Sequence, residues 1–171
     1  PLNEPNVEWH TNSWQEGTFA TKADIYRMVA ELDKAITESG ADTKIVIPEM
    51  GEMKMLFEVA ENERIPDDII RSMFYDDGAY SVMQFKNLYN CLAAHDYWTA
   101  YPPSLLVDIR AQVRDSLAKN NRDTKFWASE YCILEKNEEI TMPSSPVKSI
   151  NLGLYVARLI HTNLAVANAA A

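Results

Sequence analysis

The chain has 171 residues, of which 47% are hydrophobic and 24% charged, and this composition is typical of one folded globular domain. Its formal net charge of −9, without any run of basic residues, argues against nucleic acid or an anionic membrane as the main partner. Its two cysteines, Cys91 and Cys132, exclude a disulfide framework and a CxxC metal site, and no hydrophobic run is long enough for a membrane span.

The first predicted elements are a helix and a short strand. Thr21 and Asp24 fit a capping box, and hydrophobic residues then recur at helical spacing until Gly40. This pattern predicts a helix over about 21–40. Residues 44–47 follow as a short run of buried-strand type, and they predict the next element.

The middle of the chain gives weaker signals. Pro48 is expected to end the strand before it, and residues 52–90 predict short helices separated by loops. Hydrophobic residues within 82–92 are spaced for the last of these helices. Residues 91–97 fit either the end of that helix or a strand.

The last third predicts helix, strand and helix. Pro103 suits the first turn of a helix with hydrophobic residues as far as Leu117, and residues 125–128 predict a strand. A polar loop then leads to a last helix, whose shared apolar face is expected to consist of Leu154, Ala157, Ile160 and Leu164.

Strands that alternate with helices predict βα units and a parallel sheet, either open and doubly wound or closed as a barrel. The polar and aromatic residues that directly follow strands favour a barrel, because a (β/α)₈ barrel places its active site at the C-terminal ends of its strands. No GxGxxG or Walker sequence is present, so we expect no nucleotide cofactor. We therefore predict an α/β fold, a partial (β/α)₈ TIM barrel with parallel strands at about 1–5, 43–48, 91–97, 124–130 and 166–171.

Both ends of the sequence look like cuts through a longer structure. The chain opens on Pro-Leu-Asn-Glu-Pro and stops on a small apolar run at 167–171, whereas domain ends usually carry a few dispensable polar residues. We expect residues 1–171 to be a single segment of a longer parent chain. The lack of a signal peptide is then uninformative about the compartment.

Two segments carry a resemblance to a known family. Asn-Glu-Pro at 3–5 with Gln-Glu-Gly at 15–17, and Trp-Ala-Ser-Glu-Tyr-Cys at 127–132, resemble the two catalytic segments of family 30 glycoside hydrolases, a family of retaining (β/α)₈ enzymes. Residues 155–168 resemble the last helix and the start of the eighth strand in that family. The resemblance covers nearly the whole chain. It implies strands four to eight with their intervening helices, without a metal or another cofactor.

The resemblance also implies the chemistry. Glu4 is expected to be the acid/base and Glu130 the nucleophile of a retaining mechanism, which needs two carboxyl groups about 5–5.5 Å apart. Tyr97 is expected to donate a hydrogen bond to the nucleophile, and Asn3 to bind the sugar 2-hydroxyl. Cys132 resembles a family position near the site, although a packed free thiol is the default interpretation of such a residue. A solvated turn residue is the alternative for Glu4.

The other candidate substrate-binding residues have open alternatives. Trp9, Trp98 and Tyr131 are expected to stack on sugar faces, although tryptophan is often simply packed. Glu49 fits a site-lining residue or a surface carboxylate equally well. His95 is expected to be a hydrogen-bonded structural residue and not a proton shuttle, because two carboxyl groups already supply the acid and the base.

The expected substrate is an oligo- or polysaccharide. Family members act on β-1,6-galactan, β-1,6-glucan, glucuronoxylan and glucosylceramide, and this sequence resembles most the members that act on β-linked galactan or glucan. The expected partners are this glycan and the remaining half of the barrel from the parent chain, and the family implies a secreted or periplasmic protein. A catalytically silent carbohydrate-binding relative and an isolated α/β domain without sugar chemistry are the alternatives.

Overall fold

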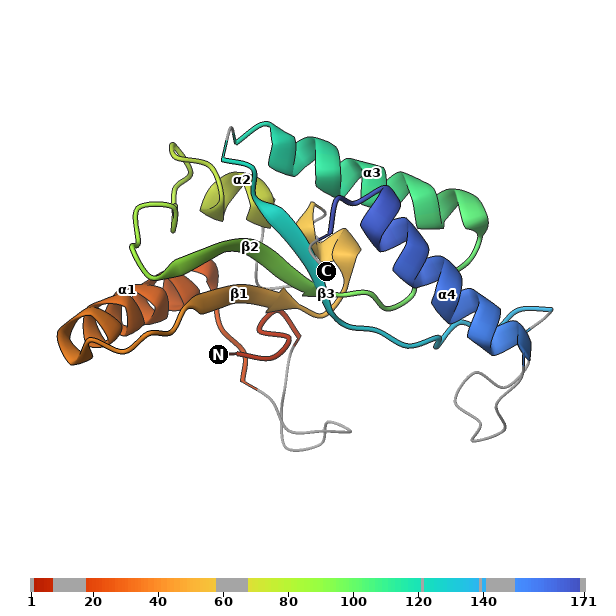
Figure 1. Ribbon diagram of the computed structural model, residues 1–171, viewed down its shortest axis with the longest axis horizontal. Helices are drawn as coiled ribbons and strands as arrows, with labels where there is room; N and C mark the ends of the chain where they lie inside the picture. Colours follow the sequence, from red (N-terminus) through yellow and green to blue (C-terminus); the bar gives the residue numbers. More distant parts are fainter. Residues whose placement is uncertain are drawn as a thin grey trace.

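The computed structural model describes residues 2–7, 18–57, 68–120, 122–138, 140 and 150–169. Within these residues helices alternate with three parallel strands (Figure 1). The fold is therefore mixed α/β, as the sequence predicts. The elements in chain order are α1 (Lys22–Ser39), β1 (Ile45–Met50), the 3-10 helix η1 (Met53–Leu56), α2 (Ile69–Met73), β2 (Leu88–His95), α3 (Pro103–Ala118), β3 (Lys125–Glu130) and α4 (Ile150–Ala165).

Helix α1 begins and ends where its capping signals predict. The Asp24 backbone N–H donates to the Thr21 hydroxyl at 3.2 Å, and the Thr21 backbone N–H donates to the Asp24 carboxylate at 3.0 Å. At the other end, Gly40 adopts a left-handed φ of 67°, which a glycine reaches without steric cost. The face between the caps buries Ile25 and Val29 against the sheet.

The sheet has the order β1-β2-β3, and its parallel register aligns Ile47 with Leu92 and Leu92 with Phe126. Successive side chains of a strand point to opposite faces. These three side chains face the helices, whereas Tyr89 and Trp127, with ring centroids 5.3 Å apart, lie on the other face. Among the described elements, the helices that share a core with the strands therefore cover one face of the sheet.

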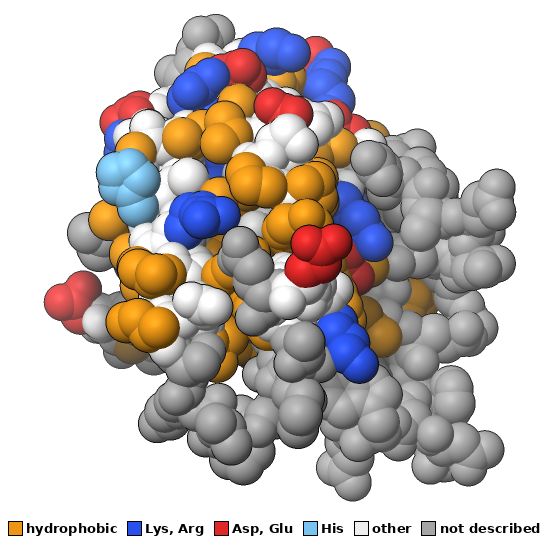
Figure 2. Space-filling model, turned by 90° about the vertical axis from the view of Figure 1, so that its right-hand side faces the viewer, with side chains coloured by type: hydrophobic (Ala, Val, Ile, Leu, Met, Phe, Trp, Pro, Cys, Tyr) orange, Lys and Arg blue, Asp and Glu red, His pale blue; other side chains and the backbone are white. Residues whose placement is uncertain are grey.

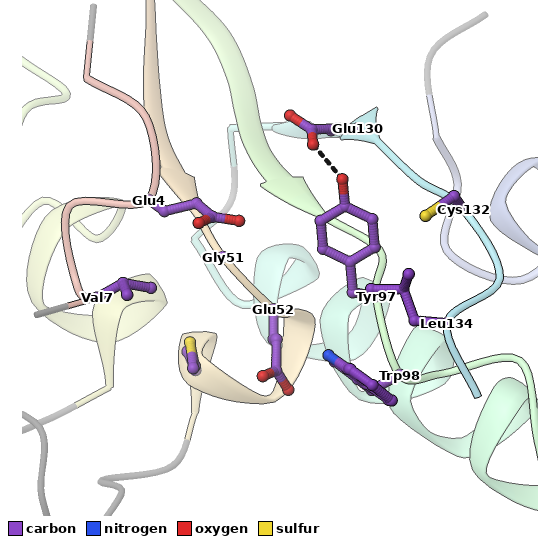
Figure 3. Close-up of a pocket in the computed structure, with 10 residues that line it drawn as sticks. Glu4, Val7, Gly51, Glu52, Tyr97, Trp98, Glu130, Cys132 and Leu134 are labelled. Carbon is purple, nitrogen blue, oxygen red and sulfur yellow. Dashed lines mark hydrogen bonds between the residues drawn. The ribbon is translucent and has the colours of Figure 1, made fainter. Parts of the chain in front are cut away.

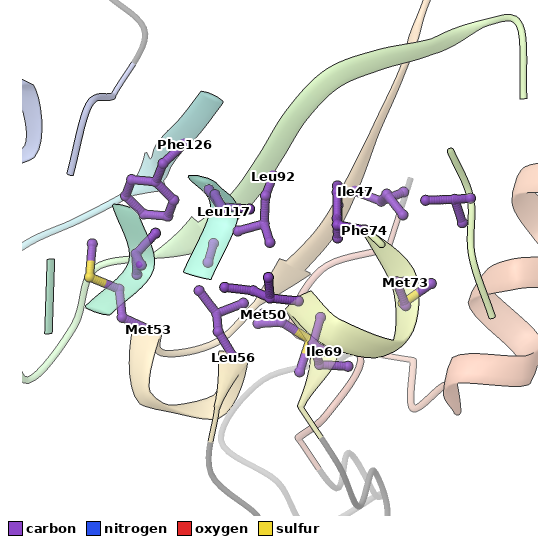
Figure 4. Close-up of a cluster of buried hydrophobic side chains, with 14 of the residues drawn as sticks. Ile47, Met50, Met53, Leu56, Ile69, Met73, Phe74, Leu92, Leu117 and Phe126 are labelled. Atoms are coloured by element: carbon purple, nitrogen blue, oxygen red, sulfur yellow. The ribbon is translucent and has the colours of Figure 1, made fainter. Parts of the chain in front are cut away.

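The main hydrophobic core lies between that face and the helices (Figure 4). Each fully buried aliphatic or aromatic side chain contributes about 1.5–3 kcal/mol relative to an exposed one. The central members are Ile47, Met50, Met53, Leu56, Ile69, Met73, Phe74, Leu92, Leu117 and Phe126. A second cluster joins α3, α4 and the segment after β3, and it consists of Ala100, Leu106, Ile133, Ile140, Tyr155 and Leu159.

Two local expectations for the middle of the chain are wrong. The helix expected over 82–92 is absent, because its first residues form turns and the rest belongs to β2. Pairing with β1 overrides the helical spacing of these hydrophobic residues. Of the two alternatives for residues 91–97, the end of a helix or a strand, the structure therefore has a strand at the start of the segment. Pro48 does not end β1, which continues to Met50 with an irregular register after the proline.

The strands expected at 1–5 and 166–171 are also wrong for the residues described. Residues 2–7 form bends and turns, since Glu4 adopts a φ of 46° that extended backbone does not allow. In the last segment only Ala169 pairs, through an isolated parallel bridge to Phe126. Both segments nevertheless lie beside the sheet. The Glu4 backbone N–H donates to the Glu49 carbonyl of β1 at 3.0 Å, and Ala169 bridges to Phe126 of β3.

Helix α4 faces the opposite way from the expected one. Leu154, Ile160 and Leu164 are 57%, 41% and 48% exposed, whereas Thr162 and Asn163 are buried. Hydrogen bonds to other parts of the fold, described below, hold Asn163 inward, and an apolar pattern does not reveal them. The Thr162 hydroxyl instead donates to carbonyls of its own helix. Figure 2 views the side of the molecule on which α4 lies, and hydrophobic side chains are spread across it. No described helix has the length and hydropathy that crossing a bilayer requires.

Candidate active site

Ionisable side chains gather at the C-terminal ends of the three strands. Glu49 stands one residue before the end of β1, while His95 is the last residue of β2 and Glu130 the last of β3. Glu4 joins them from the turn beside β1. Because the strands are parallel and adjacent, these ends meet at one edge of the sheet.

His95 is the centre of this group and is only 1% exposed. Its Nδ1 lies 2.9 Å from Glu4 Oε1, within hydrogen-bond distance. Its Nε2 lies 3.5 Å from Glu130 Oε2 and 3.7 Å from Glu49 Oε2, and both distances are too long for a good hydrogen bond. One imidazole ring therefore separates Glu4 from the other two carboxyl groups.

The backbone around Glu4 is held by specific contacts. Its φ of 46° is uncommon for a residue with a side chain, and its backbone N–H donates to the Glu49 carbonyl. The Gly51 backbone N–H donates to Asn6 Oδ1 at 3.1 Å, which ties the same turn to the end of β1. A Cβ on Gly51 would lie 3.3 Å from Val7 Cγ2 and 3.4 Å from Glu4 Cδ, so this glycine lies close to the turn that carries Glu4.

Glu130 has a more open environment, with its side chain 52% exposed. The Tyr97 hydroxyl donates a hydrogen bond to Glu130 Oε1. Burial and this hydrogen bond raise the pKa of Tyr97, so the phenol stays a neutral donor. Burial, and next the charge of Glu130, raise the pKa of the Cys132 thiol, so Cys132 is a protonated wall residue and not a thiolate nucleophile.

A cavity of about 580 Å³ opens beside these groups (Figure 3). Its volume is in the range of small-ligand sites. Five residues that the sequence analysis names as site candidates line it: Glu4, Tyr97, Trp98, Glu130 and Cys132. The remaining lining residues are Val7, Gly51, Glu52, Met55 and Leu134.

The other nominated residues lie elsewhere. Glu49 is half-buried and accepts a hydrogen bond from the Ser129 hydroxyl, but it does not line the cavity. Asn3 and Tyr131 are exposed and outside the cavity wall. Trp9 lies outside the described residues, as does the Gln-Glu-Gly segment at 15–17.

No chemical signal in the sequence singles out Gly51, Glu52, Met55 and Leu134. The available signal was position, because each follows the end of β1 or β3 by at most a few residues. In a parallel sheet such residues belong to the loops above the strand ends. Among the described residues, no group of three or more His, Cys, Asp or Glu side chains is arranged to hold a metal ion.

A buried ion pair supports the site from behind. Asp96, between His95 and Tyr97 in sequence, pairs with Arg110 of α3, and both side chains are completely buried. Arg110 Nε donates to Asn163 Oδ1 at 2.7 Å, and Asn163 Nδ2 donates to Asp96 Oδ2 at 2.8 Å. Burial lowers the pKa of Arg110, and the charge of Asp96 counters this effect. The network connects the end of β2 to α3 and α4.

Comparison with known proteins gives one family and one solved structure. The family described as O-Glycosyl hydrolase family 30 matches residues 1–171. The crystal structure of a conserved exported protein from Bacteroides fragilis is similar with a TM-score of 0.90 and 69% sequence identity, over 99% of this chain and 34% of that one. The chain thus spans about a third of the length of that protein. No curated protein matches the chain.

Proposed function

The chain belongs to O-glycosyl hydrolase family 30, and on this premise we propose that it carries the catalytic pair of a retaining glycoside hydrolase. In this proposal Glu4 is the acid/base and Glu130 the nucleophile. The observation that carries it is that both carboxyl groups line one cavity and contact opposite nitrogens of the same imidazole, that of His95. Retaining hydrolysis needs two carboxyl groups that reach the same glycosidic bond.

The reaction then proceeds in two displacements. The Glu130 carboxylate attacks the anomeric carbon and forms a glycosyl–enzyme ester, while Glu4 gives its proton to the glycosidic oxygen and the leaving sugar departs. Glu4, now a carboxylate, takes a proton from a water molecule that attacks the same carbon. This second step breaks the ester and releases Glu130, and the two inversions give a product of retained configuration.

Two neighbours position the reacting groups. Tyr97 donates to Glu130 Oε1, which orients the nucleophile and leaves its other oxygen for attack. His95 holds Glu4 Oε1 at 2.9 Å and has no exposed surface from which to exchange protons readily with solvent. We therefore assign His95 a positioning role, in line with the structural role expected from the sequence.

The proposal extends to the whole molecule. The one-sided sheet, with Glu4 beside one edge and Ala169 bridged to the other, supports an arc of a (β/α)₈ barrel that the parent chain completes. The exported Bacteroides fragilis protein supports a secreted or periplasmic location. The substrate we propose is a β-linked glycan such as β-1,6-galactan or β-1,6-glucan, bound by residues that include Trp98.

The catalytic pair is tested with alanine variants of the parent protein. Glu130→Ala should abolish turnover of every substrate, and added azide should restore it with a glycosyl azide of inverted configuration. Glu4→Ala should spare dinitrophenyl glycosides, whose leaving group needs no proton, while activity on polysaccharide is lost. Azide should then intercept the glycosyl–enzyme and give a product of retained configuration. Glu31→Ala, at an exposed position of α1, serves as the control.

The configuration of the azide products decides the assignment. The reverse pairing of variants and products would exchange the two roles. Full activity of both variants on polysaccharide would refute a role of this pair in hydrolysis.

A further inference from the structure

One end of the cavity combines an aromatic side chain with a carboxyl group that the two-displacement mechanism does not use. The indole of Trp98 and the carboxyl group of Glu52 point toward one another there (Figure 3). Trp98 follows the end of β2 and Glu52 follows the end of β1. Met55 and Leu134 also line the cavity and add apolar surface.

The backbone of Trp98 is strained in a way that packing does not explain. Its φ is 60°, and a bulky residue in the left-handed region is a steric outlier. Its side chain gains little burial in return, because the residue is 49% exposed. Such strain is found mainly at functional sites, and here it places the indole in the cavity wall.

Glu52 contributes charge to the same wall. Its side chain is 18% exposed, and Lys54 Nζ lies 2.8 Å from its Oε2, which leaves Oε1 as the oxygen that this ion pair does not use. Lys54 itself does not line the cavity. Among the described residues the ionisable wall therefore consists of carboxyl groups, those of Glu4, Glu52 and Glu130, with Tyr97 and Cys132 protonated.

The position of Glu4 tells which part of the substrate meets this wall. The acid must reach the glycosidic oxygen, so the leaving group lies on the side of the cavity that carries Glu4. Glu52 stands on that side, since the adjacent Gly51 packs against the Glu4 carboxyl group. An aromatic face next to a carboxylate suits a sugar ring, which offers C–H groups to the indole and hydroxyl donors to the carboxylate.

Building on the proposed function, we propose that Glu52 and Trp98 form the subsite for the leaving group, and that Glu52 makes it selective for uncharged sugars over uronic acids. A hydroxyl of a neutral sugar donates to Glu52. The carboxylate of a uronic acid would instead meet a second negative charge in a partly desolvated pocket, where like charges repel strongly.

The test uses two aryl glycosides that differ in one charge. Their sugar is β-linked galactose or glucose, as in the glycans proposed above, and their leaving groups are methyl 4-hydroxybenzoate and 4-hydroxybenzoate. The quantity measured is the ratio of kcat/KM for the anionic substrate to that for the neutral one. Comparing this ratio between variants cancels the intrinsic difference in reactivity between the two leaving groups. Glu52→Gln should raise the ratio about tenfold at low ionic strength, and less in high salt, because exposed charges are screened.

Three further variants make the result specific. Glu52→Asp keeps the charge and should keep the low ratio. Trp98→Ala should lower kcat/KM for both substrates without changing their ratio. Glu31→Gln removes one exposed carboxylate on α1 and should change neither quantity. Two outcomes would overturn the subsite. One is a ratio that stays within about twofold of the parent value in Glu52→Gln. The other is a change of the ratio in Glu31→Gln as large as that in Glu52→Gln.

Failure of the proposed function is a separate outcome. If the parent protein hydrolysed neither glycoside nor any β-glycan, the hydrolase proposal would fail. The subsite is then judged by calorimetric titration of the same two glycosides into Glu130→Ala, with and without Glu52→Gln. The ratio of the two dissociation constants should shift in favour of the anionic ligand, again about tenfold. An unchanged ratio would refute the subsite.

Discussion

Replacing Arg110 by methionine tests whether the buried ion pair holds the end of β2 in place. Methionine keeps much of the apolar volume of the side chain and removes its charge. Asp96 would then lose its cation while remaining completely buried. Two other groups still donate to Asp96, the Asn163 amide and the Thr99 hydroxyl. The substitution also removes the side-chain hydrogen bonds that Arg110 donates to Asn163 Oδ1 and to the Leu106 carbonyl.

The expected cost follows from burial. Removing one partner of a buried ion pair costs about 3–5 kcal/mol, mostly because the other charge stays uncompensated. The two remaining donors to Asp96 place the cost for Arg110→Met near the lower limit, at about 3 kcal/mol. Asp96→Asn in the same chain removes the orphaned charge, so the double variant should recover a large part of this loss. Because Asp96 lies between His95 and Tyr97, kcat should fall with Arg110→Met as well.

The assay is thermal unfolding of the parent protein, followed by circular dichroism, together with kcat on an aryl glycoside. Arg114→Met is the matched control, since Arg114 lies on the same helix and pairs with Asp115 at exposed positions. An exposed pair contributes about 0–1 kcal/mol, so the control should unfold within about 2 °C of the parent protein. If Arg110→Met unfolded at the temperature of the control, the buried pair would not stabilise this part of the fold.

Three further expectations follow from the structure. Tyr97→Phe removes the donor to Glu130 and should lower kcat/KM by roughly 10–100-fold, the effect of one hydrogen bond to a charged group, and unchanged kinetics would contradict its orienting role. Hydrogen bonds from Thr21 lower the pKa of Asp24 to about 2 from 3.8, so the stability it contributes is complete above pH 4 and is lost as the pH falls toward 2. Melting curves against pH should show this loss, and Thr21→Ala should flatten it. Residues 1–171 expressed alone should aggregate or remain molten, because α4 exposes Leu154 and its neighbours, and a cooperative monomeric melt would refute this.

Local signals made parts of the fold predictable. The capping residues Thr21 and Gly40 act within one helix, so α1 could be located from the sequence alone. The region before β2 could not, because its conformation depends on distant partners. The Asn87 backbone N–H donates to Asp33 at 2.7 Å, and the backbone N–H of Ile45 donates to the Asn87 carbonyl at 2.8 Å. The spacing of hydrophobic residues over a short stretch does not predict such long-range contacts.

The same distinction applies to the candidate site. Glu4 and Glu130 stand in motifs whose neighbouring residues resemble a family, and that resemblance also implies the role of Tyr97, so all three could be named before the structure was known. Glu52 stands in no motif, and its contact with the cavity depends on how η1 turns the chain after β1. The buried face of α4 could not be predicted from the sequence either, because Asn163 on that face forms hydrogen bonds with the distant residues Arg110 and Asp96.

The left-handed backbone at Glu4 sets two contributions to stability against each other. A glycine there would relax the backbone by about 1 kcal/mol, yet it would delete the carboxyl group that lies 2.9 Å from Nδ1 of the buried His95. A buried polar group left without a partner costs about 1–3 kcal/mol, so the exchange gains no stability. Glu49 also has a left-handed backbone, but its carboxyl group is half-buried and lies outside the cavity. Stability screens that ignore turnover should therefore accept glycine or asparagine at Glu49 more readily than at Glu4.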